Sequence, residues 1–147
     1  MINSQENQRS IQSLAEETVR LGRELEREAR SAKVGGSTAA HGFVARSLRC
    51  LAKRNPFDER DEASLDALCG ILDADLESEI VSTDTRFVET RFDAMGPHGE
   101  FRDVPVYSER GEHLLRVRSM LAAFLHVRAA TLDAIAAETA VAGLLRV

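Results

Sequence analysis

The side chains best suited to metal binding or nucleophilic catalysis are four histidines and two cysteines. They are scattered along the chain as His41, Cys50, Cys69, His98, His113 and His126. Zinc and di-iron sites need ligands at fixed spacings, as in Cys-x-x-Cys, His-Glu-x-x-His or Glu-x-x-His, and none of these patterns occurs. No histidine lies in a known nucleophile motif. The sequence therefore predicts no metal and no cofactor, and it favours a protein that is not an enzyme.

One pair of residues has a spacing that suits RNA cleavage. Arg91 and His98 are separated by six residues, and an arginine can hold a scissile phosphate while a histidine transfers a proton. This pair resembles the Arg-x(4–6)-His signature of HEPN-type helical ribonucleases, although Phe92 stands where that family places a polar residue. The resemblance covers two residues. It implies an alternative function, a ribonuclease with Arg91 and His98 as its catalytic residues.

A second alternative is nucleic-acid binding by a basic cluster. The cluster comprises Arg46, Arg49, Lys53 and Arg54, and such side chains bind phosphates. No aromatic residue stands among the arginines to stack on a base. Between residues 16 and 30 arginines alternate with glutamates, a pattern typical of ion pairs on a helix surface. Nucleic-acid binding is therefore kept as an alternative and is not favoured.

Composition favours a helical protein with one core. The chain has 147 residues, 44% of them hydrophobic and only 5% aromatic, with no tryptophan. Strands favour aromatic and β-branched residues, so this balance indicates helices packed through aliphatic residues. The first ten residues are polar, and we find no uninterrupted apolar run long enough to span a bilayer. We expect a single domain over residues 1–147, flexible at 1–9, in a cytoplasmic protein that does not enter membranes.

Charge is distributed unevenly over a net charge of −5. Residues 1–55 carry ten basic and six acidic side chains, whereas residues 56–100 carry three basic and thirteen acidic ones. The main interpretation is that oppositely charged helix faces are solvated or pair with each other. The alternative is an acidic surface for a basic partner.

Apolar and small residues recur at helical spacing in the first half of the chain. A helix is predicted over residues 4–33, with a seam formed by Ile11, Ala15, Thr18, Gly22, Leu25, Ala29 and Ala32. Gly35 and Gly36 follow it and favour a helix end. A short helix is predicted over 38–54, which ends before Pro56 because the residue before proline avoids helical angles.

The middle of the chain is predicted to continue as helix and then to form a loop. Leucines at helical spacing begin a helix at Asp58, and Val88, Phe92 and Met95 keep that spacing, so the helix is carried to Met95 with a kink allowed at 82–85. Residues 96–107 then form a loop in which short extended structure is allowed. Its apolar residues are Phe101, Val104, Val106 and Tyr107, and we expect them either to bind a partner or to cap the bundle.

The last helix, over residues 108–145, carries the clearest pattern. Its seam consists of Ala122, Leu125, Ala129, Leu132, Ala136, Thr139 and Gly143, in which every seventh residue is small. Small residues let two helix backbones approach closely, so this seam is predicted to pair lengthwise with another helix. A second face, with Leu114, Val117, Leu121 and Phe124, indicates that this helix contacts partners on two sides.

These elements predict an all-α four-helix bundle with three long helices and one short helix. One short helix cannot cover three long ones, so part of their apolar surface would stay exposed. We therefore expect a homodimer that uses the seam Ala122 to Ala136. The favoured function is association with another protein, as an adaptor, accessory subunit, chaperone or regulator.

Overall fold

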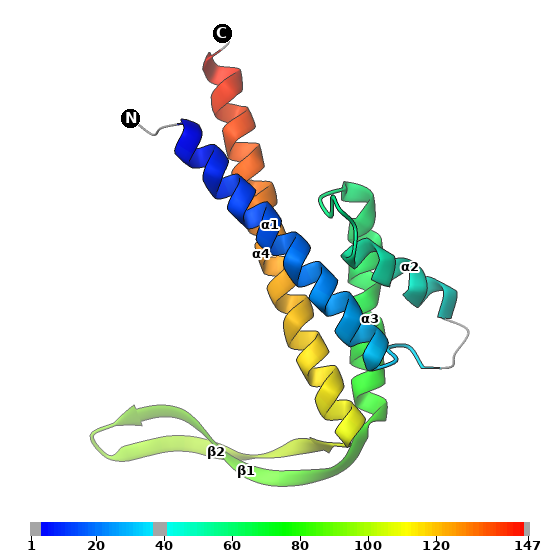
Figure 1. The fold of residues 1–147 in the computed structure, drawn as a ribbon. Helices are drawn as coiled ribbons and strands as arrows, with labels where there is room; N and C mark the ends of the chain where they lie inside the picture. The colour runs from blue at the N-terminus through cyan, green and yellow to red at the C-terminus, as the bar shows by residue number, and fades with distance from the viewer. Residues whose placement is uncertain (1–3, 37–40, 146–147) are drawn as a thin grey trace.

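The computed structural model describes residues 4–36 and 41–145. Four helices form one body, and a two-stranded antiparallel hairpin projects from one end of it (Figure 1). In chain order the elements are α1 (Ser4–Ser31), α2 (His41–Leu51), the 3-10 turn η1 (Glu59–Asp61), α3 (Glu62–Ser78), β1 (Ile80–Asp93), β2 (Gly96–Tyr107) and α4 (Glu109–Leu145). The fold is therefore α+β, and the predicted all-α four-helix bundle is wrong.

The hairpin is the element that the sequence interpretation misassigned. The helix predicted to reach Met95 ends at Ser78, and β1 begins at Ile80. The segment 96–107, predicted as a loop, forms β2 over its whole length. Short extended structure had been allowed there, but a strand of 12 residues had not.

The residues of β1 explain why it is a strand. Thr83, Thr85 and Phe87 alternate along it, and β-branched and aromatic side chains suit a pleated surface better than a helix. The turn is equally well specified. The Met95 backbone N–H donates to Asp93 Oδ1 at 2.8 Å, and Gly96 has a φ of +105°, which a residue with a side chain rarely adopts.

α1 and α4 lie side by side and run in opposite directions (Figure 1). The predicted α1 seam is buried from Thr18 to Ala32, where it packs against α4 and α2. Gly22 marks the closest approach: a Cβ there would lie 2.2 Å from the Leu51 carbonyl oxygen and 3.0 Å from the Phe124 ring. Only a glycine fits at this crossing.

The core lies between the four helices. Its largest buried side chains are Leu25 from α1, Leu51 from α2, Leu65, Leu68 and Leu72 from α3, and Leu114, Val117, Leu121 and Phe124 from α4. In the described part of the chain, no side chain of residues 80–106 is buried. The hairpin thus lies outside the core, and Tyr107 at its end packs against the core margin.

A buried arginine holds the segment between α2 and α3 against α4. Arg128 is 3% exposed. Its guanidinium donates to the Pro56 carbonyl at 2.7 Å and the Asp58 carbonyl at 3.1 Å, and it forms an ion pair with Glu62. A buried charge needs such partners, so the position of this segment depends on Arg128.

Candidate interaction surface

The base of the hairpin is fixed by a cluster of polar groups around Arg110. Its guanidinium donates to the Ala32 and Lys33 carbonyls at the end of α1, at 3.2 and 2.8 Å, and pairs with Glu79 at 2.9 Å after α3. Ser108 immediately precedes α4, donating its hydroxyl to Glu79 and accepting from the Gly111 N–H at 3.1 Å. One cluster therefore joins the ends of α1 and α3 to the start of α4.

Glu79 is ionised more easily because of these contacts. The Ser108 hydroxyl bond, together with the Arg110 guanidinium, lowers the pKa of the Glu79 carboxyl below its usual value. The carboxylate is therefore the form that holds the hairpin base together.

The two strands pair so that their side chains separate into two different faces. Phe87 lies opposite Phe101, and Phe92 lies opposite Pro97 on the same face beyond a register shift. The Phe87 and Phe101 rings meet edge to face with centroids 5.5 Å apart. We call this the aromatic face and define it by Phe87, Phe92, Pro97 and Phe101.

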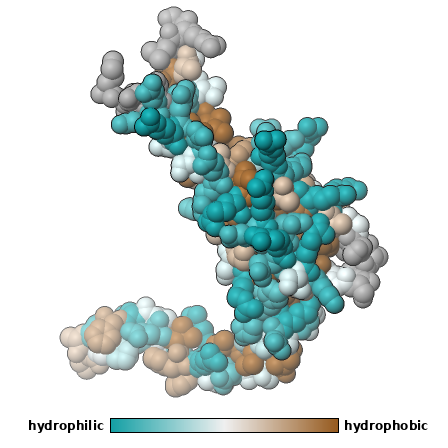
Figure 2. All heavy atoms as spheres, viewed as in Figure 1, coloured by the Kyte–Doolittle hydropathy of each residue, from teal (hydrophilic) through white to brown (hydrophobic). Residues whose placement is uncertain are grey.

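The aromatic face is open to solvent. Phe92 and Phe101 are each 74% exposed and Phe87 is 47% exposed. Figure 2 shows hydrophobic residues along the hairpin, whereas the visible surface of the helical body is mostly hydrophilic. Isolated hairpins with two strands are marginally stable in water, so an uncovered apolar face on one is an uncommon feature.

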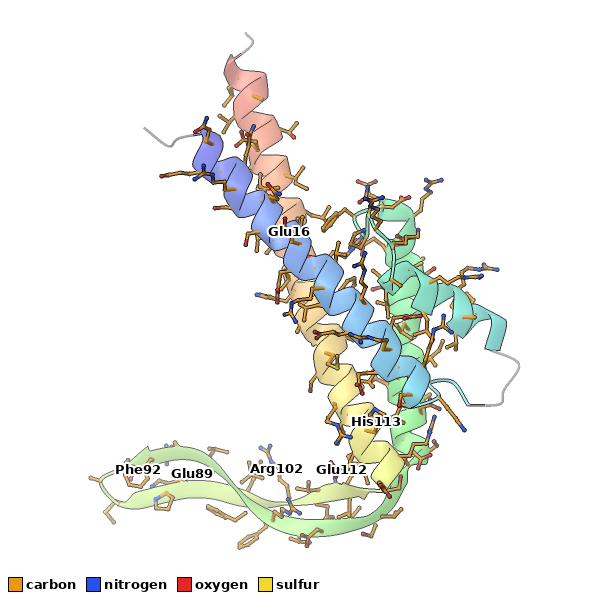
Figure 3. The ribbon with its side chains drawn as sticks, viewed as in Figure 1. Glu16, Glu89, Phe92, Arg102, Glu112 and His113 are labelled. Carbon is orange, nitrogen blue, oxygen red and sulfur yellow. The ribbon has the colours of Figure 1, made fainter. Side chains whose placement is uncertain are left out.

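The charges of the aromatic face are all acidic. Glu89 and Asp103 lie on it, and Asp103 Oδ1 accepts from the Thr85 hydroxyl at 2.8 Å. Figure 3 places Glu89 and Phe92 together near the hairpin tip and Arg102 nearer the base. The face therefore combines aromatic anchors with a negative border.

The opposite face is charged with both signs and contains the predicted ribonuclease pair. Arg86 lies opposite Arg102, and Arg91 lies opposite His98. The structure thus brings Arg91 and His98 together, on paired strands rather than on a helix. His98 Nε2 is 2.9 Å from Asp93 Oδ1, so the ring is oriented by a carboxylate.

The four residues predicted to bind a partner lie in three different places. Phe101 lies on the aromatic face, whereas Val104 and Val106 lie on the charged face and are half-buried. Tyr107 is half-buried against the core margin. The sequence interpretation missed Phe87 and Phe92, because both were assigned to a helix; alternation with Thr83 and Thr85 was the signal that could have identified them.

The predicted dimer seam is not the face by which α4 packs in the core. α4 packs on α1 and α3 through its second face, which includes Leu121 and Phe124. The seam residues Ala122, Ala129 and Ala136 are exposed, and Leu125 and Leu132 are half-buried. The seam is therefore available to another helix.

The predicted basic cluster lies on α2 and the turn after it. Arg46, Arg49, Lys53 and Arg54 are all exposed. Lys53 donates to Asp61 Oδ1 at 2.7 Å, and in the described residues the three arginines form no ion pair. The cluster is accessible, but Asp61 neutralises one of its four charges.

A buried thiol lies beside the Lys53–Asp61 pair. Cys50 Sγ is 3.4 Å from Asp61 Oδ1. Burial, followed by the hydrogen bond and charge of Asp61, raises the pKa of the Cys50 thiol. This environment favours the protonated thiol, which is a poor nucleophile.

Among residues 4–36 and 41–145, no three histidine, cysteine, aspartate or glutamate side chains gather where they could hold a metal ion. The helix Glu109–Leu144 is long and apolar enough to cross a membrane, judged by length and composition alone.

Comparison of the chain with protein families, curated proteins and solved structures finds no match.

Proposed function

We propose that this chain is a non-enzymatic binding protein that engages another protein through the aromatic face of its hairpin. The observation that carries the proposal is the exposure of Phe87, Phe92 and Phe101 on one face of an element that lies outside the core. Aromatic side chains are the common anchors of protein interfaces because they bury a large area at a small entropic cost. The roles that fit are those of an adaptor, accessory subunit, chaperone or regulator.

The chemistry of the face defines the partner surface. Three phenylalanine rings call for apolar pockets, and the carboxylates of Glu89 and Asp103 favour a basic border around them. Both strands also have an unpaired edge, because the described sheet contains β1 and β2 only. An extended segment of the partner could therefore add to the sheet by backbone hydrogen bonds.

The test compares partner capture by variants of the two faces. Phe87→Ser with Phe101→Ser removes two anchors, and we expect capture of proteins from a cell extract to fall more than tenfold, since each anchor contributes about 1–2 kcal/mol. Arg86→Ser with Arg102→Ser changes the opposite face at a neighbouring pair of positions and serves as the matched control. Equal capture by both double variants would contradict the proposal.

A ribonuclease remains a second candidate function because Arg91 and His98 lie opposite each other. The arrangement would let Arg91 hold a phosphate while His98, oriented by Asp93, transfers a proton. The assay is cleavage of single-stranded RNA by the purified protein. Cleavage that Arg91→Ala and His98→Ala each abolish would support this candidate, and the absence of cleavage by the unaltered chain would exclude it.

A further inference from the structure

The C-terminal half of α4 is an apolar helix with little cover. Ala129 and Ala136 are exposed, Val141 is 52% exposed and Leu144 is 77% exposed. Residues 129–144 contain only two charged side chains, Asp133 and Glu138. An apolar helix surface of this length indicates an interface.

The chain exposes more surface than a compact monomer of its mass. Its accessible area is 10093 Å² for a mass of 16.2 kDa. A folded monomer of that mass exposes about 7,500 Å², so the excess is roughly 2,600 Å². Obligate homodimers bury about 1,000–2,500 Å² on each subunit. The projecting hairpin and the α4 half together therefore expose enough additional surface for a stable dimer.

We propose that a second copy of this chain covers the α4 seam, with the two α4 helices antiparallel around a two-fold axis. This inference goes beyond the proposed function, because it names a different partner, a second copy, and a surface separate from the aromatic face. The axis lies between Ala129 and Leu132, so each seam layer pairs residues whose numbers sum to the same value. The layers are Ala122 with Thr139, Leu125 with Ala136, and Ala129 with Leu132.

Side-chain size favours the antiparallel arrangement. Each leucine of the seam meets an alanine of the second copy, so the Leu125–Ala136 and Ala129–Leu132 layers each hold one large and one small side chain. A parallel arrangement would place leucine against leucine at 125 and alanine against alanine at 129. Crowded layers would then alternate with empty ones, which costs packing energy.

Charge favours the same arrangement. His126 and Asp133 are exposed and flank the seam on one side, seven residues apart. In the antiparallel pair, His126 of each copy lies across from Asp133 of the other, giving two pairs of opposite charge when the imidazole is protonated. In a parallel pair, His126 and Asp133 of the two copies would lie on opposite sides of the seam and could not meet.

A groove between α3 and α4 extends the seam. It has a volume of about 380 Å³ and is lined by Cys69, Leu115, Leu121, Ala122 and Leu125, with the Arg118–Asp73 ion pair at its border. With Ala122 opposite Thr139, the last turns of the second copy's α4 reach this groove. The exposed end of each α4 thus enters an apolar groove on the other subunit.

The second copy is favoured over a lipid bilayer. α4 is long and apolar enough to span a membrane, but one face of its first half packs in the helical body and its exposed half carries two acidic side chains. Acidic groups are costly in hydrocarbon. Recovery of the chain only in detergent would therefore overturn the proposal.

Solution mass tests the dimer. Light scattering of the purified chain should give twice the 16.2 kDa mass across a dilution series, and Ala129→Glu with Ala136→Glu should halve it while circular dichroism shows the helices retained. The matched control, Ala123→Glu with Ala137→Glu, places the same charges on exposed α4 positions outside the seam and should remain dimeric. A monomeric unaltered chain, or a dimer that survives the seam charges, would overturn the inference.

Cross-linking tests the orientation. With Cys50 and Cys69 replaced by serine, Ala122→Cys together with Thr139→Cys should form a covalent dimer on mild oxidation, and Ala122→Cys alone should not. Cross-linking by Ala122→Cys alone would overturn the antiparallel arrangement. The proposed function fails separately, because only loss of the aromatic face, and not of the seam, should abolish capture of a different protein.

Discussion

Phe124 and Phe101 are the same residue type in two opposite settings. The Phe124 ring is completely buried between α1 and α4, whereas the Phe101 ring is 74% exposed on the hairpin. In the core of the helical body, apolar side chains are covered by the chain itself; on the aromatic face and at the C-terminal end of α4 they are largely exposed. The difference separates residues that stabilise the fold from residues that are available to a partner.

The largest expected effect comes from making the same substitution, phenylalanine to alanine, at both positions. Phe124→Ala should lower the free energy of unfolding by about 4 kcal/mol, because it leaves a cavity in the core. Phe101→Ala should change it by less than about 0.5 kcal/mol, as for exposed positions in general. Urea unfolding followed by circular dichroism measures both. Equal losses would mean that the hairpin is part of the cooperative core.

The buried arginine should give the next largest effect. Arg128→Ala leaves the Pro56 and Asp58 carbonyls without their donor, and we expect a loss of about 3 kcal/mol in the free energy of unfolding. Arg102→Ala, on the exposed hairpin, is the control and should be nearly neutral. A neutral Arg128→Ala would show that the segment between α2 and α3 is held by other contacts.

Substitution of Gly22, where two backbones come close together, should have an intermediate effect on the free energy of unfolding. Gly22→Ala forces a methyl group onto the Leu51 carbonyl and should lower the free energy of unfolding by about 2 kcal/mol. Gly70→Ala, in α3 with nothing within 4 Å of the added carbon, should instead raise it by about 0.5–1 kcal/mol. Thermal melting of the two variants gives shifts of opposite sign if the α1 crossing is as close as described.

The smallest effect concerns pH and the base of the hairpin. Because the pKa of Glu79 is lowered in the folded state, its contribution to stability is present above the unfolded value of about 4.3 and is lost as pH falls below it. Urea midpoints measured between pH 7 and pH 3 should fall less steeply for Glu79→Gln than for the unaltered chain. Glu77→Gln, two residues earlier and exposed, is the control.

The helices could be predicted from sequence because their signals are long and agree with one another. The last helix was expected over 108–145 and runs from Glu109 to Leu145, and the first was expected over 4–33 and ends at Ser31. The second helix, expected over 38–54, ends at Leu51, three residues before the predicted end, and its predicted start at 38–40 lies outside the described residues. The expectation of flexibility at 1–9 falls partly on residues 1–3, outside the described residues, and Ser4 onward is helical in α1.

The hairpin was missed because its apolar residues satisfy two periods, and the helical period was preferred. Val88, Phe92 and Met95 lie at helical spacing, while Thr83, Thr85 and Phe87 alternate as in a strand. Three residues are too few to discriminate between these periods. The face that α4 presents to α1 was equally ambiguous, because both of its apolar stripes repeat at helical spacing. Tertiary packing decides which of the two stripes is buried, and the sequence of α4 alone does not show which one that is.

The Arg110 cluster has a mechanical consequence. The Arg110 guanidinium, at the start of α4, contacts the end of α1 and Glu79 after α3. The connection between the hairpin and the helices is therefore not flexible. A load applied at the tip by a bound protein acts on a lever about 40 Å long, from strands of 12 to 14 residues. Its torque is delivered to three helices at their shared end, where it would act to separate them.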